Sequence, residues 1–249
     1  MAGHSHWNNI QHKKGKADAI RARAWSKLSR AIIIAARHGG GDPAMNLKLR
    51  CAIDAARSIS MPKDNIERAI KRGTGEGEAV TYDEINYEGF APGGVAILVD
   101  VATDNRARTK GEIFKIFERG GGNPGSPGSV AYLFERKGLV TVPAAVEEDA
   151  LMGVVLDAGA EDLRREGDVY EIVTDVPGFQ AVVEALREAG VPTASASLEQ
   201  LPKTRVDADV ETGLKVLRLA EMLEENEDVQ KVYTNLNLTE EIVAAASKG

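Results

Sequence analysis

The hydrophobic pattern of this 249-residue chain changes its period near Thr74, and this change constrains the fold more than any other feature. Before that point apolar residues recur every three or four positions, as in amphipathic helices, and after it they alternate as in β-strands. The segment 74–78 mixes Gly with Glu, a composition typical of a linker. We therefore expect a domain boundary here, after a domain built from helices.

Three helices are expected in the first part of the chain. Residues 16–37 carry the helical period, and the glycines at 39–41 can adopt the left-handed conformation that ends a helix. Asp42 is then the expected N-cap of a second helix that reaches about Ser58. A third helix is expected to end at Gly73.

The remaining chain predicts two mixed units, one interrupted by the other. The outer unit should contain strands at 85–90, 95–101 and 129–134, a helix at 106–119, and later a helix at 210–225 and a strand at 229–235. The inner unit should contain a strand at 139–142, a helix at 147–158, strands at 161–166 and 169–174, a helix at 177–189 and a strand at 194–200. The inner order, β-α-β-β-α-β, is ferredoxin-like.

The expected fold class is therefore α+β with three domains, an N-terminal helical bundle and two ferredoxin-like α/β domains, one inserted in the other. The bundle should span residues 1–76. The outer domain is discontinuous, at 77–136 and 204–249, and the inserted domain spans 137–203.

Positive and negative residues are also distributed unequally between the first part of the chain and the rest. Residues 1–72 contain 15 Lys and Arg against 5 Asp and Glu, although the whole chain has a net charge of −7. Such asymmetry is typical of a basic module for a polyanion joined to an acidic body. Nucleic acid is the polyanion that we expect as the partner.

Basic residues of the first helix would form one stripe along it, which we expect to face solvent and to contact phosphates. The alternative is an ordinary solvated helix face. A second basic group opens the helix at 106–119, where helix-start amides and two arginines could hold an anion. The predicted nucleic-acid-binding residues are Lys13, Lys14, Lys16, Arg21, Arg23, Lys27, Arg30, Arg37, Arg106 and Arg108.

Other classes of protein are disfavoured by what the sequence lacks. No segment approaches the roughly 18 apolar residues of a membrane span, and residues 1–7 contain no apolar core of a signal peptide. The single Cys51 fits a reducing compartment and a core thiol. No catalytic or nucleotide-binding motif occurs. We expect a cytoplasmic protein without membrane contact, enzymatic activity or cofactor.

Histidines, tryptophans and a glycine-rich segment leave alternatives open. His4, His6, His12 and His38 lack the spacing of a metal site, so surface histidines are the favoured interpretation. Trp25 is expected in the helical core, whereas Trp7 could stack on bases or pack. The segment 120–129, GGGNPGSPGS, is either a helix cap followed by a turn or a loop whose backbone approaches a ligand or RNA closely.

Six motifs spread along the chain are similar to those of the YebC family of bacterial proteins. They are AGHSHW at 2–7, GGGDP at 39–43, MPKDN at 61–65, YEGFAPGG at 87–94, DNR at 104–106 and GSVAYLF at 128–134. His6 and Pro124 depart from the family pattern, which often has Lys and Leu there.

The resemblance covers the whole chain and implies a helical domain followed by two α/β domains, one inserted in the other. It also implies a regulator of gene expression, because members are described as transcriptional regulators that bind DNA. Related proteins, including a mitochondrial translational activator of cytochrome oxidase, act on the ribosome. DNA is therefore the expected target and ribosomal RNA the alternative, and the sequence indicates no oligomeric state.

Overall fold

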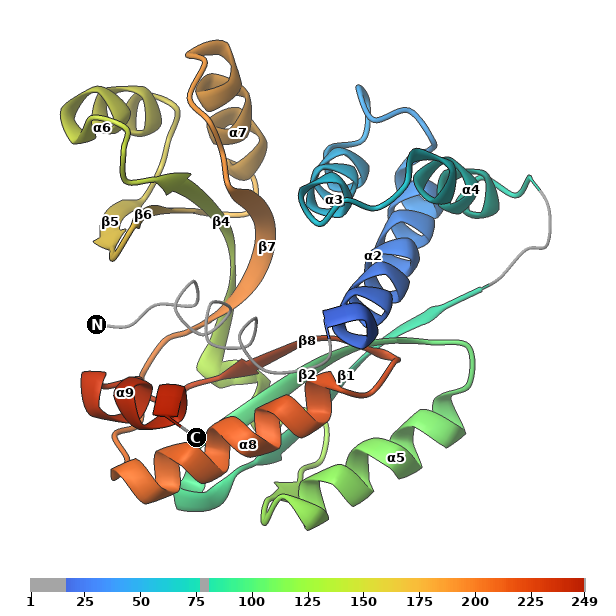
Figure 1. Ribbon diagram of the computed structural model, residues 1–249, viewed down its shortest axis with the longest axis vertical. Coiled ribbons are helices and arrows are strands. Elements are labelled where there is room, and N and C mark those ends of the chain that lie inside the picture. The colour runs from blue at the N-terminus through green and yellow to red at the C-terminus, as the bar shows by residue number, and fades with distance from the viewer. Residues whose placement is uncertain (1–16, 77–80, 249) are drawn as a thin grey trace. The chain divides into compact units, whose positions relative to one another are not determined.

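The computed structural model describes residues 17–76 and 81–248. These residues form two compact units, which Figure 1 shows as ribbons. Residues 135–201 make up one unit, and the other described residues, on both sides of this segment, make up the second. One unit is thus inserted into the chain of the other.

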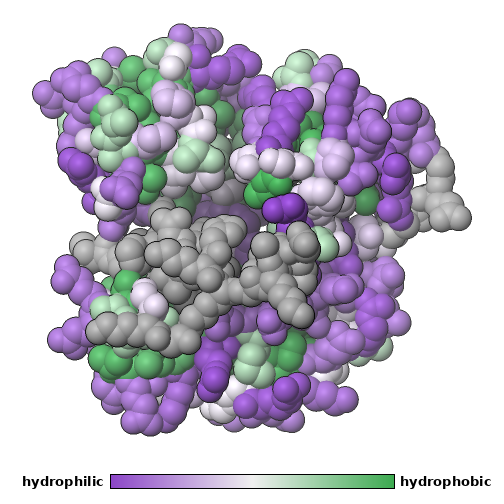
Figure 2. Space-filling view, in the orientation of Figure 1, coloured by the Kyte–Doolittle hydropathy of each residue, from purple (hydrophilic) through white to green (hydrophobic). Residues whose placement is uncertain are grey.

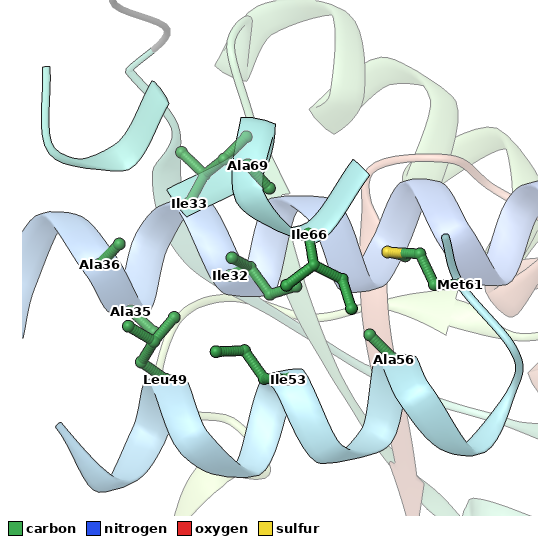
Figure 3. Packing of buried hydrophobic residues seen from close by; sticks show 10 residues of the cluster. All are labelled: Ile32, Ile33, Ala35, Ala36, Leu49, Ile53, Ala56, Met61, Ile66 and Ala69. Carbon is green, nitrogen blue, oxygen red and sulfur yellow. The ribbon is translucent and has the colours of Figure 1, made fainter. Parts of the chain in front are cut away.

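The helical region, residues 17–76, contains α2 (Ala17–Gly39), α3 (Leu47–Ser58) and α4 (Lys63–Gly73). Apolar side chains spaced at helical intervals meet between the three helices, as Figure 3 shows for Ile32, Ile53 and Ile66. At Gly73 an added Cβ atom would lie 2.5 Å from the carbonyl oxygen of Ile33. Only glycine therefore allows the end of α4 to approach α2 this closely.

The predicted start of the second helix at Asp42 is wrong. Residues 43–45 form a turn, in which the Asp42 carboxylate accepts a hydrogen bond from the amide of Ala44, and α3 begins at Leu47. Asn46 is the N-cap: its side-chain oxygen accepts from Leu49 N at 3.1 Å, and its buried amide donates to the carbonyls of Ala35 and Gly40. Asn46 therefore caps the start of α3 and is also hydrogen-bonded to the end of α2. Asp42 makes neither of these contacts.

In the same unit, the described strands of the first sheet are β1 (Asp83–Phe90), β2 (Ala96–Thr103), β3 (Asn123–Pro124) and β8 (Val229–Thr234), in the order β3-β1-β2-β8. The pairs of β2 with β1 and with β8 are antiparallel. The helices α5 (Arg106–Arg119) and α8 (Val210–Glu224) pack beside each other against this sheet (Figure 1). A further helix, α9 (Glu240–Lys248), packs on α8.

The predicted strand at 129–134 is also wrong. The chain forms a 3₁₀ turn, η2 (Ala131–Leu133), and the strand begins only at Phe134. The cause is the buried carboxylate of Glu88, which accepts hydrogen bonds from the amides of Gly128, Val130 and Ala131. Amides that point at one carboxylate cannot form a ladder with a neighbouring strand.

The inserted unit contains, in chain order, β4 (Phe134–Pro143), α6 (Glu148–Asp157), β5 (Asp162–Glu166), β6 (Val169–Thr174), α7 (Phe179–Glu188) and β7 (Ser195–Pro202). The strand order β5-β6-β4-β7 and the β-α-β-β-α-β succession are ferredoxin-like. The predicted fold class is confirmed: a helical N-terminal region is followed by mixed α/β structure. The exact limits of three domains stay a prediction.

No helix among the described residues is both long and apolar enough to cross a membrane.

Candidate nucleic-acid interface

The basic stripe of α2 does not face solvent along its whole length. Arg23, Lys27 and Arg30 contact the segment that joins α8 to β8, residues 224–228, which has the sequence EENED and is called the acidic turn below. The prediction that the stripe faces solvent is therefore wrong for Lys27 and Arg30, whereas the side chain of Arg23 remains 37% exposed. Spacing along α2 brought them onto one face, and that face lies against the chain's own carboxylates and carbonyls.

Arg30 makes the most buried of these contacts. Its guanidinium lies 3.3 Å from Oδ1 of Asp228, and the two side chains are only 15% and 5% exposed. It also donates a hydrogen bond to the carbonyl oxygen of Glu227 and lies over the ring of Tyr82, 5.6 Å from its centroid. A guanidinium is suited to such a site because it presents several donors and stacks on aromatic faces.

Lys27 and Arg23 extend the contact along the turn. The ammonium of Lys27 donates to the carbonyl oxygen of Glu224 at 2.7 Å, and Arg23 lies 3.4 Å from the carboxylate of Glu225. Burial lowers the pKa of Lys27, and the neighbouring charges of Arg23 and Arg30 act in the same direction, although Glu224 opposes them. The three cations are thus crowded against a single short turn.

Asp228 joins the acidic turn to the sheet. One of its oxygens, Oδ2, accepts hydrogen bonds from Thr109 at 2.6 Å, from Arg108 at 2.7 Å and from Thr103 at 3.1 Å. Burial by itself raises the pKa of this carboxyl, but the three hydrogen bonds outweigh burial and the pKa is lowered. Asp228 therefore stays ionised while it holds α2, α5 and β2 around it.

The two predicted arginines at the start of α5 are also paired within the chain. Arg106 donates to Asp83 at 2.8 Å, and Arg108 contacts Asp104 as well as Asp228. Both side chains remain more than two-fifths exposed on the surface. The hydrogen bond to Asp83 raises the pKa of Arg106, and the hydrogen bond to Asp228 does the same for Arg108.

A second group of cations lies at the opposite end of α2. Arg37 is in the last turn of α2, Lys71 and Arg72 are in the last turn of α4, and Lys48 is in the first turn of α3. We call these four residues the cationic end. Within the described residues none of them is paired with a carboxylate, and Arg37, Lys48 and Lys71 are exposed. Figure 2 shows mostly hydrophilic residues on the visible surface of α3 and α4.

Four further predicted residues have different outcomes. Lys13, Lys14 and Lys16 lie outside the described residues, as do Trp7, His4, His6 and His12. Arg21 is exposed on α2. Among the described predicted residues, Lys27 and Arg30 are thus largely covered by contacts within the chain, whereas Arg21, Arg37, Arg106 and Arg108 are exposed.

Sequence reasoning missed the acidic turn as the counterpart of the stripe. The signal was present, since EENED holds four acids in five residues. Nothing in one sequence states that residues 200 positions apart will meet. Asp228 also sits at a strand start and gives no periodic signal.

The glycine-rich segment 120–129 is ordered by contacts within the chain. Gly120 caps α5, and the segment then pairs with β1 through β3. At Gly122 a Cβ atom would lie 2.6 Å from the carbonyl oxygen of Phe90. The glycine is thus needed here because the backbone lies close to the end of β1. Pro124 lies in β3, at the outer edge of the sheet, where a missing amide costs no ladder hydrogen bond.

The other side chains considered for chemistry are structural where they are described. Trp25 packs against the helical core as predicted, and its ring nitrogen donates to the carbonyl of Ile59. Burial raises the pKa of Cys51 to about 11, which fits a core thiol and not a nucleophile. His38 lies 3.8 Å from Glu84. In the described part of the chain no cluster of His, Cys, Asp and Glu could hold a metal ion.

Family models match almost the whole chain. Residues 5–76 match the TACO1/YebC protein N-terminal domain, and residues 82–236 match the TACO1/YebC second and third domain. The chain belongs to the TACO1/YebC family. The resemblance predicted from six motifs is confirmed.

Several relatives carry the name probable transcriptional regulatory protein. One from Rubrobacter xylanophilus is 52% identical over 98% of both chains. Another from Treponema denticola is 50% identical over 96% of this chain and 98% of its own length. A crystal structure of a conserved hypothetical protein from Aquifex aeolicus superposes with a TM-score of 0.85 at 46% identity, covering 95% of this chain and 98% of that one.

Proposed function

We propose that this protein is a cytoplasmic, non-enzymatic regulator of gene expression that binds DNA through its helical region. The observation that carries the proposal is the cationic end, a group of outward cations on a region whose relatives are named as transcriptional regulators. Phosphate binding requires cationic donors and little else, so such a group is sufficient for the sequence-independent part of DNA affinity.

The placement of Lys48 supports this role. Arg37, Lys71 and Arg72 lie at helix C-termini, where cations are favoured by the helix dipole and need no further explanation. Lys48 lies in the first turn of α3, which contains no acid, so the dipole disfavours its charge. A phosphate beside Lys48 would compensate this cost and would also lie near the positive end of α3.

Among the predicted residues, we assign direct phosphate contact to Arg37 and Arg21, together with the other cations of the cationic end. Lys13, Lys14 and Lys16 remain proposed contacts of the same surface. Arg106 and Arg108 are proposed as weaker contacts, because a phosphate must compete there with Asp83, Asp104 and Asp228.

The experiment measures the affinity of a labelled DNA duplex against salt concentration for the variant Arg37→Glu/Lys71→Glu. The control, Lys115→Glu/Arg218→Glu, reverses two exposed cations on α5 and α8 and has the same net charge. We expect the first variant to lose at least about tenfold in affinity and its salt slope to fall by about two, since each phosphate contact contributes about 0.9. The control should keep the wild-type slope.

A single-stranded RNA and a folded ribosomal RNA fragment serve as the second and third probes. Tighter binding of the RNA fragment than of any DNA would replace DNA as the target while keeping the interface. Equal slopes for both variants and the wild-type protein would remove the cationic end from the interface. Absence of binding to all three probes would overturn the proposed function.

A further inference from the structure

The contact between α2 and the acidic turn brings three cations together on one short segment. Arg23, Lys27 and Arg30 all end on the same five residues, although almost 200 positions separate the two segments. Their partners are two carboxylates and two backbone carbonyl oxygens. These oxygen atoms contact the three cations. The oxygens of a nucleic-acid phosphate backbone would do the same.

The contact is polar on both sides. The buried cluster of the helical region is made of residues from α2, α3 and α4 and of Met61 between α3 and α4, and the partly buried Tyr82 also packs against it. The cluster therefore closes without α8 or β8. Separating the helical region from the acidic turn would expose mainly ions and carbonyls, which water can solvate, and little apolar surface.

The buried ions also limit how strong the contact can be. Taking Lys27, Arg30 and Asp228 out of water costs free energy that their mutual attraction only partly returns. The lowered pKa of Lys27 reflects this cost. A ligand that supplies phosphates to the same cations in a solvated groove can thus compete with the turn.

We propose that the acidic turn is an autoinhibitory contact, which occupies Arg23, Lys27 and Arg30 in the unbound protein and yields them to a nucleic-acid backbone. This inference rests on the proposed function and adds its regulation. The cationic end, which includes Arg37, then makes the first contact with phosphates. Arg23, Lys27 and Arg30 become fully available only when the turn is displaced.

The test removes two of the four side-chain charges of the turn and keeps its backbone. The variant Glu224→Gln/Glu225→Gln retains the carbonyl that accepts from Lys27, and it leaves the buried Asp228 in place, so the fold is preserved. The matched control, Glu240→Gln/Glu241→Gln, removes two exposed carboxylates from α9 and changes the net charge equally. Both variants and the wild-type protein are titrated into a labelled random-sequence DNA duplex across a range of salt concentrations.

We expect the turn variant to bind the duplex more tightly than the control at low salt, with a salt slope steeper by about one, because Arg23 loses its carboxylate partner and can reach a phosphate. Amide hydrogen exchange at residues 224–228 of the wild-type protein should accelerate when the duplex is saturating, since the turn has lost its partners.

Equal affinities and slopes for the turn variant and the α9 control, with unchanged exchange at the turn, would overturn autoinhibition while leaving nucleic-acid binding intact. In that case the contact between α2 and the acidic turn is a fixed part of the fold that does not open on binding. If neither the wild-type protein nor the turn variant binds the duplex, the proposed function on DNA fails, and the regulation proposed here fails with it.

Discussion

Glu88 and Asp228 are both almost fully buried, and their carboxylates are satisfied in different ways. Glu88 in β1 accepts three backbone amides from one short stretch of chain. Asp228 accepts from hydroxyl and guanidinium groups of β2 and α5 and faces Arg30 from α2. Backbone amides close to one another in sequence fix a local loop, whereas side chains from separate elements fix the arrangement of those elements.

The difference has a physical consequence for what each residue can regulate. The partners of Glu88 are neutral, and another anion cannot attract them away without unfolding the loop. Two partners of Asp228 are cations that a phosphate would also bind. Only the second arrangement is thus open to competition by a polyanion, and the predictions below compare the two.

The largest expected effect is that of Asp228→Ala. Removing this carboxylate leaves Arg30 and Thr109 without their acceptor in a buried site, which should lower the free energy of unfolding by about 3–5 kcal/mol. The control Asp104→Ala removes an exposed partner of Arg108 and should cost less than about 1 kcal/mol. Chemical denaturation of both variants checks this, and equal losses would show that Asp228 is no more than a surface ion pair.

A smaller effect is expected from Glu88→Gln. The substitution keeps the shape of the side chain but replaces one accepting oxygen by an amide NH2 group, which only donates, so at least one backbone amide of residues 128–131 loses its acceptor. We expect a loss of about 1–3 kcal/mol and faster hydrogen exchange confined to this stretch. Glu84→Gln, on the exposed part of the same strand, is the control. Uniformly faster exchange throughout the first sheet would contradict a local role.

Acid should affect both carboxylates in the same direction. Burial by itself raises both pKa values, but the hydrogen bonds prevail and lower them in the folded protein. Their stabilisation is therefore complete above the unfolded pKa values, near about 4, and is lost as the pH falls through the folded values. Urea unfolding between neutral and strongly acidic pH should show the advantage of the wild-type protein over Asp228→Asn shrinking as the pH falls. A constant difference would mean that Asp228 is not ionised.

The smallest effect on stability is expected at the cationic end. Arg37→Glu and Lys48→Glu change exposed side chains without carboxylate partners in the described structure, so each should alter the free energy of unfolding by no more than about 0.5 kcal/mol. Thermal unfolding measures this directly. A large loss would place these cations among the structural charges, with Arg30, and would weaken their assignment to phosphate binding.

The sequence determined the local structure and the family. Periodicity placed the helices of the first 76 residues and the succession of elements in the inserted unit, because side-chain burial on one face of an element repeats with the period of that element. Where a polar side chain decided the backbone, local reasoning failed: Asn46 replaced Asp42 as a cap, and Glu88 turned a predicted strand into a 3₁₀ turn. Each depends on which partner the fold brings near.

The tertiary structure alone decided which cations are available. The period of α2 correctly placed Arg23, Lys27 and Arg30 on one face, but a helical period cannot say what that face meets. The acidic turn follows a different helix nearly 200 residues later, and it meets α2 only because β8 pairs with β2 at the centre of the sheet. Charge along a sequence is local, whereas the field that a cation experiences depends on every group the fold places around it.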